Sequence, residues 1–316
     1  MKQTIGHLEF ELTFDPWEED LKTLRIDKEY AVQLNIKSLD SPSYSHRGID
    51  YEFCTEITPC GGKPMKTQQN SLRLTEAGSI PSSTPFTLPK ISFPEYSQTY
   101  HGALFNVRHF IRVWVRKLIG SDFFEQELEV YRIVPYANHF EPFFVSVCIA
   151  DSLGVDYLIS RRKYDINDMI VGQVRFSNVN LQVKILRVQI VAQEMFEING
   201  VSRKFKNILN YWELAYGTPV NNEVIPFRLF LAPVQVSPSC SNPKDGYSVT
   251  HYLHFTIVTD SGVKYYKSLQ ISFYKMSRLP FFFTGEDDAF IQKLESEKRA
   301  QESQEIQTQE KDEFDE

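Results

Sequence analysis

Residues 8–14 read Leu-Glu-Phe-Glu-Leu-Thr-Phe, and this alternation of apolar and polar side chains decides the fold class. The same period of two returns in residues 30–36, 49–57 and 111–116. Successive side chains of a strand point to opposite faces, so the pattern predicts strands with one buried face and one wet face. Antiparallel β-sandwiches are built from such strands.

A second series of strand-like segments follows a break at residues 135–139, which read Pro-Tyr-Ala-Asn-His. These segments are apolar or alternating, and Gly, Pro, Asn and Asp separate them. They are residues 143–150, 155–159, 169–176, 181–192, 224–231, 249–258 and 265–274. No stretch before residue 286 predicts a helix of several turns. We therefore expect an all-β protein with two sandwich domains, residues 1–136 and 140–276.

Two segments depart from this pattern. Residues 58–83 are rich in Gly, Pro, Gln and Ser, and we expect much of this segment to be a mobile loop with one short strand. Residues 286–316 hold 12 acidic and 4 basic side chains, and we expect an acidic disordered tail. The formal charge of the whole chain is −7, so the remaining body is close to +1. A nearly neutral body argues against a nucleic-acid binder, and against strong direct docking on anionic lipid.

The chain of 316 residues is 42% hydrophobic, which is enough for two packed cores. Four cysteines are too few for a disulfide framework at this length. The first residues form no signal peptide, the longest nearly apolar stretch (residues 142–150) is too short to span a bilayer, and the chain ends in no lipidation motif. We expect a soluble cytosolic protein.

Motifs of catalysis or metal binding are missing from the sequence. His251 and His254 lie three apart in an alternating run, where they would point to opposite faces of a strand and share no metal. Cys54 and Cys60 lack a second ligand pair at matching spacing. The basic triplet Arg161–Lys163 is interpreted as a solvated turn between two strands, with a lipid headgroup contact as the alternative. We expect no enzyme, no metal and no cofactor. A β-sandwich hydrolase with two distant carboxylates stays as an alternative, and so does a β-sandwich lectin.

The second half resembles a known family. Residues 164–172 read Tyr-Asp-Ile-Asn-Asp-Met-Ile-Val-Gly, and residues 211–220 read Tyr-Trp-Glu-Leu-Ala-Tyr-Gly-Thr-Pro-Val. The run Ile-Pro-Phe-Arg-Leu-Phe-Leu follows at residues 225–231. In order and spacing these pieces resemble the vacuolar protein sorting-associated protein twenty-six family, the arrestin-like subunit of the retromer coat. The resemblance implies two arrestin-like sandwiches in tandem.

The first half resembles the same family more loosely. Ser45–Ile49 is similar to a strand opening of the family, and Tyr100–Ala103 is similar to the stretch before its last long strand. Residues 60–71 match nothing in the family, and an apolar, Gly-rich N-terminus common among its members is missing.

The resemblance implies a docking site for the α-solenoid scaffold subunit of retromer. It lies in a loop that aligns with Leu214 and Ala215, with Trp212 and Tyr216 beside them. Residues 211–217 are unusually apolar for a turn, which is typical of a contact surface. A hairpin tip folded on its own sheet is the alternative. Pro226 indicates an edge strand, because proline cannot donate to a ladder on both sides.

The resemblance also implies binding to cytosolic tails of transmembrane cargo receptors and to sorting nexins. Val147 and Tyr266 align with the cargo pocket, where an extended peptide would bind at a sheet margin; ordinary strand packing is the alternative for both. Asp27 aligns with an acidic position that meets a nexin. The implied location is the cytoplasm, with indirect recruitment to the cytosolic face of endosomes.

Two other trafficking adaptors remain alternatives to the retromer subunit. A retriever-type subunit shares the fold and the residues Tyr-His-Gly at 100–102, whereas the run at 225–231 favours retromer. A receptor-regulating arrestin relative would often carry Pro-Pro-x-Tyr motifs, and the sequence contains no Pro-Pro.

Overall fold

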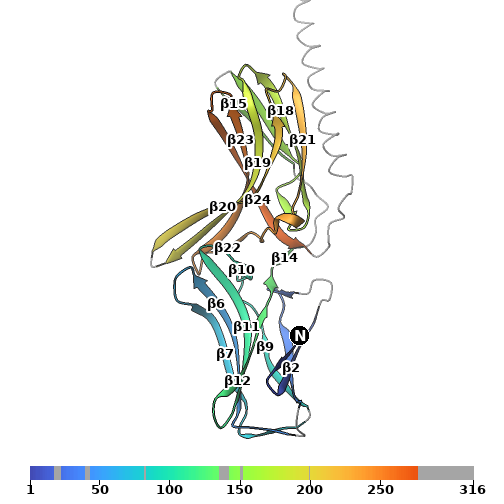
Figure 1. The fold of residues 1–316 in the computed structure, drawn as a ribbon, viewed down its shortest axis with the longest axis vertical. Coiled ribbons are helices and arrows are strands. Elements are labelled where there is room, and N and C mark those ends of the chain that lie inside the picture. The colour runs from blue at the N-terminus through green and yellow to red at the C-terminus, as the bar shows by residue number, and fades with distance from the viewer. Residues whose placement is uncertain are drawn as a thin grey trace, which may run out of the picture. The chain divides into compact units, whose positions relative to one another are not determined.

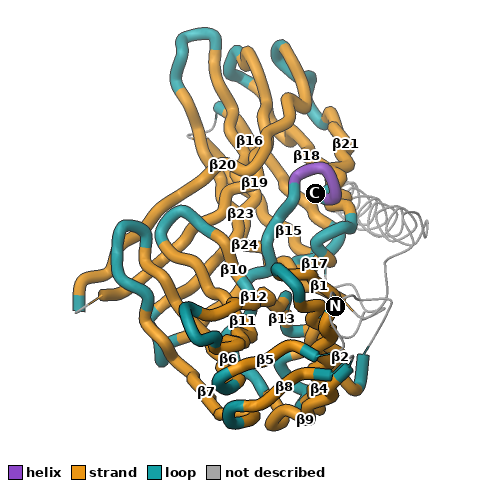
Figure 2. The backbone as a smooth tube through the Cα atoms, turned by 60° about the horizontal axis from the view of Figure 1, so that its bottom comes forward, coloured by secondary structure: helices purple, strands orange, loops and turns teal. Residues whose placement is uncertain are grey.

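The computed structural model describes residues 1–17, 23–39, 43–81, 83–134, 142–149, 152–198 and 200–276. Strands make up most of this part of the chain (Figure 2), which confirms the all-β prediction. Its one helical element is the short 3₁₀ turn Ala232–Val234. The predicted acidic tail, residues 286–316, lies outside the described residues.

The chain divides into two compact units, and the division is not a single cut near residue 136. Unit 1 consists of Met1–Val134, Glu194–Phe205 and Cys240–Val249. Unit 2 consists of the remaining stretches, Pro135–Gln193, Lys206–Ser239 and Thr250–Glu316. Two tandem domains with the predicted boundaries therefore stay a prediction, and each unit is described by itself.

Unit 1 is built on two antiparallel sheets (Figure 1). The first has the order β1 (Lys2–Ile5), β2 (Leu8–Asp15), β4 (Tyr30–Ser38) and β9 (Thr84–Ile91). The second has the order β10 (Tyr100–His101), β11 (Phe105–Arg116), β6 (Ile49–Pro59) and β7 (Met65–Thr75), and β12 (Ser121–Leu128) pairs with β11. Smaller elements are β3 (Leu24–Arg25), β5 (Tyr44–His46), β8 (Gly78–Ile80), β13 (Val130–Tyr131), β14 (Ile133–Val134) and β22 (Cys240–Asn242).

The alternation of residues 8–14 does build the core of unit 1. Leu8, Phe10 and Leu12 are fully buried, and the ring of Phe10 stacks on that of Phe124 at 5.0 Å between centroids. Because burying an aromatic side chain contributes on the order of 2 kcal/mol, this paired face helps to stabilise the unit.

A second apolar cluster explains why residues 194–205 and 240–249 belong to unit 1. Phe105 of β11 packs on Phe196 at 5.3 Å and on Tyr247 at 4.9 Å between ring centroids. The buried carboxylate of Glu194 accepts hydrogen bonds from the backbone N–H groups of Ala103 and Leu104, at 3.0 and 2.7 Å. Contacts distant in sequence therefore attach these two segments to the first.

Unit 2 also contains two sheets. One has the order β15 (Phe143–Ile149), β16 (Leu153–Ile159), β18 (Met169–Val179) and β21 (Glu223–Phe230). The other includes, in order, β24 (Lys264–Met276), β23 (Tyr247–Thr259), β19 (Val183–Ile198) and β20 (Val201–Tyr216), and β17 (Lys163–Asp165) pairs with β24. The long strands β19, β20 and β23 each contribute residues to both units.

The structure explains two residues of the motifs that resemble the family. Pro226 lies in β21, which ends its sheet, so the predicted edge strand is confirmed. Gly172 lies in β18 between two partner strands, and a Cβ atom there would approach the Leu158 carbonyl oxygen and Phe227 to 2.5 Å. A larger residue at 172 would therefore force the strands apart.

Two predictions about local structure are wrong. Residues 65–75 form the strand β7 instead of a loop, and polar contacts such as Lys66 to Glu52 bind it to β6. Nearly all its described side chains are exposed, so it lacks the alternation that reveals a strand. Arg161 is not solvated: its side chain is buried and paired with the buried carboxylate of Asp168.

Candidate docking site

The residues expected to bind a scaffold lie in strand β20, which corrects the prediction of a loop. Trp212, Leu214, Ala215 and Tyr216 lie at the end of this 16-residue strand. The chain turns immediately afterwards at Gly217, whose φ is +83° and whose N–H donates to the Lys184 carbonyl at 3.0 Å. The long hairpin with β19 therefore continues the sheet through a stretch that was expected to be a connection.

These four residues do not share one environment. Trp212, Leu214 and Ala215 are half-buried and pack against the core of unit 2, whereas Tyr216 is 72% exposed. Three of them therefore pack against the core of unit 2, and Tyr216 is the one of the four whose ring is exposed. Half-buried apolar residues beside an exposed aromatic ring form a rigid platform, which is typical of binding anchors.

Further exposed apolar residues of β20 escaped the sequence analysis. Ile208 is 53% exposed and Tyr211 is 55% exposed. The Arg187 guanidinium lies 5.1 Å from the Tyr211 ring centroid and donates to Glu213 at 2.6 Å. In the sequence, the apolar character of residues 205–216 is the feature that points to them. Because no strand was predicted there, these side chains could not be assigned to an exposed face.

Strand β20 is the last strand of its sheet within the described chain, with β19 as its neighbour. An edge strand presents unpaired backbone N–H and C=O groups, which can pair with an added strand. The exposed side chains therefore lie along an open backbone edge.

The two residues expected to bind cargo lie in different sheets of unit 2. Val147 is in β15, half-buried and packed against the core. Tyr266 is in β24, 60% exposed, and its ring meets that of His254 edge-on at 5.2 Å between centroids. The structure thus gives Val147 the packing role that was its alternative, and leaves Tyr266 as the accessible member of the pair.

Asp27, the residue expected to meet a nexin, lies just after β3 in unit 1. Arg25 donates to both of its carboxylate oxygens, from Nε at 3.0 Å and from a terminal nitrogen at 2.7 Å. These hydrogen bonds lower the pKa of Asp27. The carboxylate is therefore exposed, charged and held in place, as an acidic contact residue must be.

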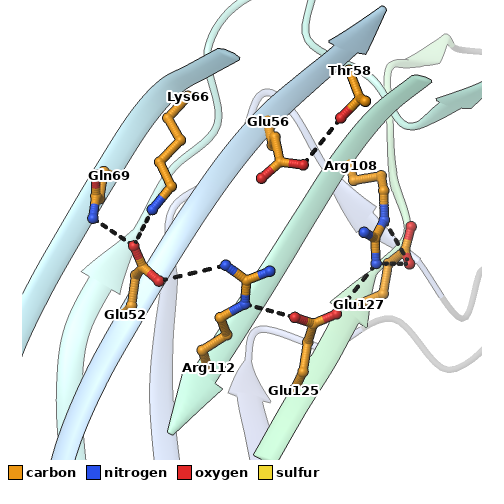
Figure 3. A network of polar contacts seen from close by, with 9 residues as sticks. All are labelled: Glu52, Glu56, Thr58, Lys66, Gln69, Arg108, Arg112, Glu125 and Glu127. Atoms are coloured by element: carbon orange, nitrogen blue, oxygen red, sulfur yellow. Dashed lines mark hydrogen bonds and ion pairs between the residues drawn. The ribbon is translucent and has the colours of Figure 1, made fainter. Parts of the chain in front are cut away.

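The outer face of the second sheet of unit 1 carries a ladder of alternating charges (Figure 3). We call the residues Lys66, Glu52, Arg112, Glu125, Arg108 and Glu127 the charge ladder. Arg112 donates to Glu125 at 2.6 Å and lies 3.7 Å from Glu52, while Arg108 donates to Glu127 at 2.8 Å. The Arg112 guanidinium also covers the ring of the buried Phe110 at 3.9 Å. Each charged side chain of the charge ladder pairs with an oppositely charged neighbour, which is typical of a protein surface that needs no binding partner.

Metal-ligating groups and disulfides are missing from the described residues. They contain no group of three metal-ligating side chains, and all four cysteines are free thiols. His251 is buried and His254 is half-buried on alternate faces of β23, as predicted. Burial lowers the pKa of His251 to about 3 and raises that of the Cys54 thiol to about 11, so neither is charged at neutral pH. Within the same residues, the structure holds no helix long and apolar enough to cross a membrane.

Comparison with known proteins places this all-β architecture in a family. The model of the family described as vacuolar protein sorting-associated protein 26 (Vps26) matches residues 14–262. The chain therefore belongs to the Vps26 family, and protein transport is its broad function.

Several curated members of the family are similar along most of the chain. The vacuolar protein sorting-associated protein 26 of Caenorhabditis elegans is 26% identical over 251 residues, covering 78% of this chain and 69% of the relative. Protein 26B of Arabidopsis thaliana is 31% identical over 193 residues, covering 61% and 63% respectively. Protein 26B of Mus musculus is 24% identical over 242 residues, covering 76% and 72%.

Proposed function

We propose that this chain is a non-enzymatic adaptor subunit of the retromer coat. In this role it binds the α-solenoid scaffold subunit and helps to select cargo for recycling from endosomes to the Golgi or to the cell surface. Family membership over residues 14–262 supports this proposal.

The observation that carries the scaffold contact is the end of β20. Tyr216 is 72% exposed beside the half-buried Leu214, and Val220 beyond the turn is 69% exposed. A solenoid end could cover these apolar side chains and remove them from water, which stabilises a complex. The core packing of Leu214 holds the strand so that little ordering entropy is lost on binding.

The test is affinity capture with the purified scaffold subunit at physiological salt. Tyr216→Asp is expected to weaken binding by about tenfold or more, because it places a charge in a desolvated contact. Leu214→Asp is a less specific variant, since Leu214 also packs on the core, and its binding counts only if its thermal unfolding is unchanged.

Phe230→Asp is the matched control for this test. Phe230 is 48% exposed in β21, which belongs to the other sheet of unit 2, and it stands outside the proposed contact surface. Equal binding by wild type and Tyr216→Asp would remove the scaffold contact from this site. Capture of receptors or ubiquitin ligases without a scaffold would favour another arrestin-like adaptor.

Cargo selection is proposed at the β24 margin, with a sorting nexin supplying the remainder of the pocket. Tyr266 has the exposure that a peptide contact needs, whereas Val147 is half-buried against the core in the other sheet. Tyr266→Asp is expected to lower peptide capture in the assembled coat while scaffold binding persists. Unchanged peptide capture would mean that the cargo pocket lies elsewhere.

The proposed nexin contact in unit 1 is tested in the same way, by the binding of a sorting nexin to Asp27→Asn.

A further inference from the structure

The turn between β11 and β12 in unit 1 exposes two consecutive aliphatic side chains. Leu118 is 76% exposed and Ile119 is 88% exposed, more than any other large aliphatic side chain in the described residues. Figure 1 shows this turn looping out at the end of unit 1 beyond the label of β12. Water therefore surrounds two apolar side chains that contribute nothing to the core.

The turn is a tight hairpin connection. The Lys117 N–H donates to the Gly120 carbonyl at 3.0 Å, which closes the hairpin, and Gly120 has φ of +76°. Glycine therefore occupies the position with positive φ, whereas Leu118 and Ile119 before it have no positive φ. The turn holds these two side chains at its tip without burying them.

Cations surround the base of this turn. Arg116 and Lys117 precede the two aliphatic residues directly. Arg47 is exposed and adjacent to them, because its N–H donates to the Arg116 carbonyl at 2.7 Å. Arg73 of β7 reaches the same region through Asp50, which it shares with Arg116.

The acidic partners of these cations lie deeper than the cations do. Asp50 has a side chain 20% exposed, against 55% for Arg116, which donates to it at 2.5 Å. Asp122 is 12% exposed, against 36% for Lys117 at 2.6 Å. Glu76, which pairs with Arg73, is the exposed exception at 79%. Apart from Glu76, the outermost charges are positive.

An open hollow of about 950 Å³ lies beside the turn. The four cations Arg47, Arg73, Arg116 and Lys117 line it together with Trp114 and Leu72, and two carboxylates, Asp50 and Glu52, also belong to the lining. Its mixed lining offers positive charge to an anionic group and apolar surface to what is attached to that group.

We propose that this end of unit 1 contacts an anionic lipid bilayer directly, with Leu118 and Ile119 inserted at the interface and the four cations facing lipid phosphates. Charge complementarity and the apolar tip support this occupant together. A convex two-residue tip buries too little area for a specific protein interface, which needs about 1,000 Å² in total. A bilayer, in contrast, accepts single apolar side chains flanked by basic ones.

This contact is weak by itself, and it adds to the indirect membrane association that family resemblance implies. Each basic residue and each inserted side chain contributes modestly, so stable attachment needs a second contact. Many copies in a coat would supply it through avidity. The inference does not depend on scaffold binding at β20.

The test is flotation of the purified full chain with two kinds of vesicle, one of phosphatidylcholine alone and one containing about 30 mol % phosphatidylserine. Wild type is expected to bind the anionic vesicles about fivefold more, and raising the salt to about 0.5 M should abolish the difference by screening. Leu118→Ser, Ile119→Ser and Arg47→Glu are each expected to lower the bound fraction about threefold.

Val263→Ser is the matched control, because Val263 is 48% exposed in the turn between β23 and β24. It should bind vesicles as wild type does, and all variants should unfold at the same temperature. Equal binding of wild type to both vesicles, or unchanged binding by Leu118→Ser and Ile119→Ser, would overturn the proposal. Scaffold capture by these variants should stay normal, which separates this test from that of the proposed function.

Discussion

The outer sheet face of unit 1 and the strand β20 differ in the kind of side chain that they expose to water. In unit 1, the charge ladder covers the sheet with ion pairs from Lys66 to Glu127. In unit 2, Ile208, Tyr211 and Tyr216 stand in water on a strand with an open edge.

The difference indicates which of the two surfaces needs a binding partner. Charges that pair with one another require no further partner and are well solvated at their rims. Exposing aromatic side chains to water costs free energy, and an edge strand can pair with a strand of another chain. Natural proteins therefore keep such side chains chiefly where a partner covers them. The surface of unit 2 is therefore the better candidate for protein binding.

The largest loss of stability is expected inside unit 2, at a buried ion pair. Asp168→Ala removes the carboxylate that pairs with the buried Arg161 and accepts the Met169 N–H at 2.8 Å. Leaving a buried guanidinium without its carboxylate costs about 3–5 kcal/mol of unfolding free energy. Denaturant unfolding measures it, and a loss under about 1 kcal/mol would show that water reaches Arg161.

A second prediction concerns two of the buried histidines, one in each unit. Burial lowers the pKa of His109 in unit 1 to about 4 and that of His251 in unit 2 to about 3. Because both folded values lie below the ordinary 6.5, their stabilisation is complete above pH 6.5 and is lost as pH falls toward 4 and 3. At pH 5 each histidine should cost about 2 kcal/mol relative to pH 7.

Unfolding at a series of pH values measures this effect. His109→Gln and His251→Gln should each flatten the dependence on pH between 6.5 and 5 without flattening it entirely. If the double variant keeps the wild-type slope, carboxylates and not these histidines are responsible.

A smaller effect is expected in the charge ladder. Arg112→Ala breaks the contacts with Glu125 and Glu52 and uncovers the ring of Phe110. Partly exposed ion pairs contribute little, so the loss should be about 1 kcal/mol and should shrink in high salt. Arg112→Met, which keeps the apolar cover, separates packing from charge: a full loss in Arg112→Met would mean that the ion pairs dominate.

The smallest effect on stability is expected on β20. Ile208→Lys and Tyr211→Lys change exposed side chains and should alter the unfolding free energy by less than about 0.5 kcal/mol. They should also reduce self-association at high concentration, because charge protects an open edge. Light scattering measures this, and unchanged scattering would show that the edge is already protected.

How far the sequence led can be judged from particular strands. Residues 8–14 predicted a strand and its buried face correctly, since Leu8, Phe10 and Leu12 alternate with polar residues. Residues 65–75 and 211–216 were interpreted as loops, although both are strands. Neither has a clean alternation, because one is polar on both faces and the other is apolar on both.

The candidate site was found only in part. Resemblance directed attention to Trp212, Leu214, Ala215 and Tyr216, but burial divides them into three packed residues and one exposed ring. The environment of a side chain depends on which strands lie beside it, and a single sequence does not contain that information.

The sequence by itself determined the all-β class and the family, because a period of two and ordered motifs are local properties of the chain. Tertiary structure alone decided that residues 194–205 and 240–249 join unit 1, that Arg161 is buried against Asp168, and that Leu118 and Ile119 stand in water. Each of these facts arises from contacts between residues distant in sequence, or from the absence of such contacts within the described chain.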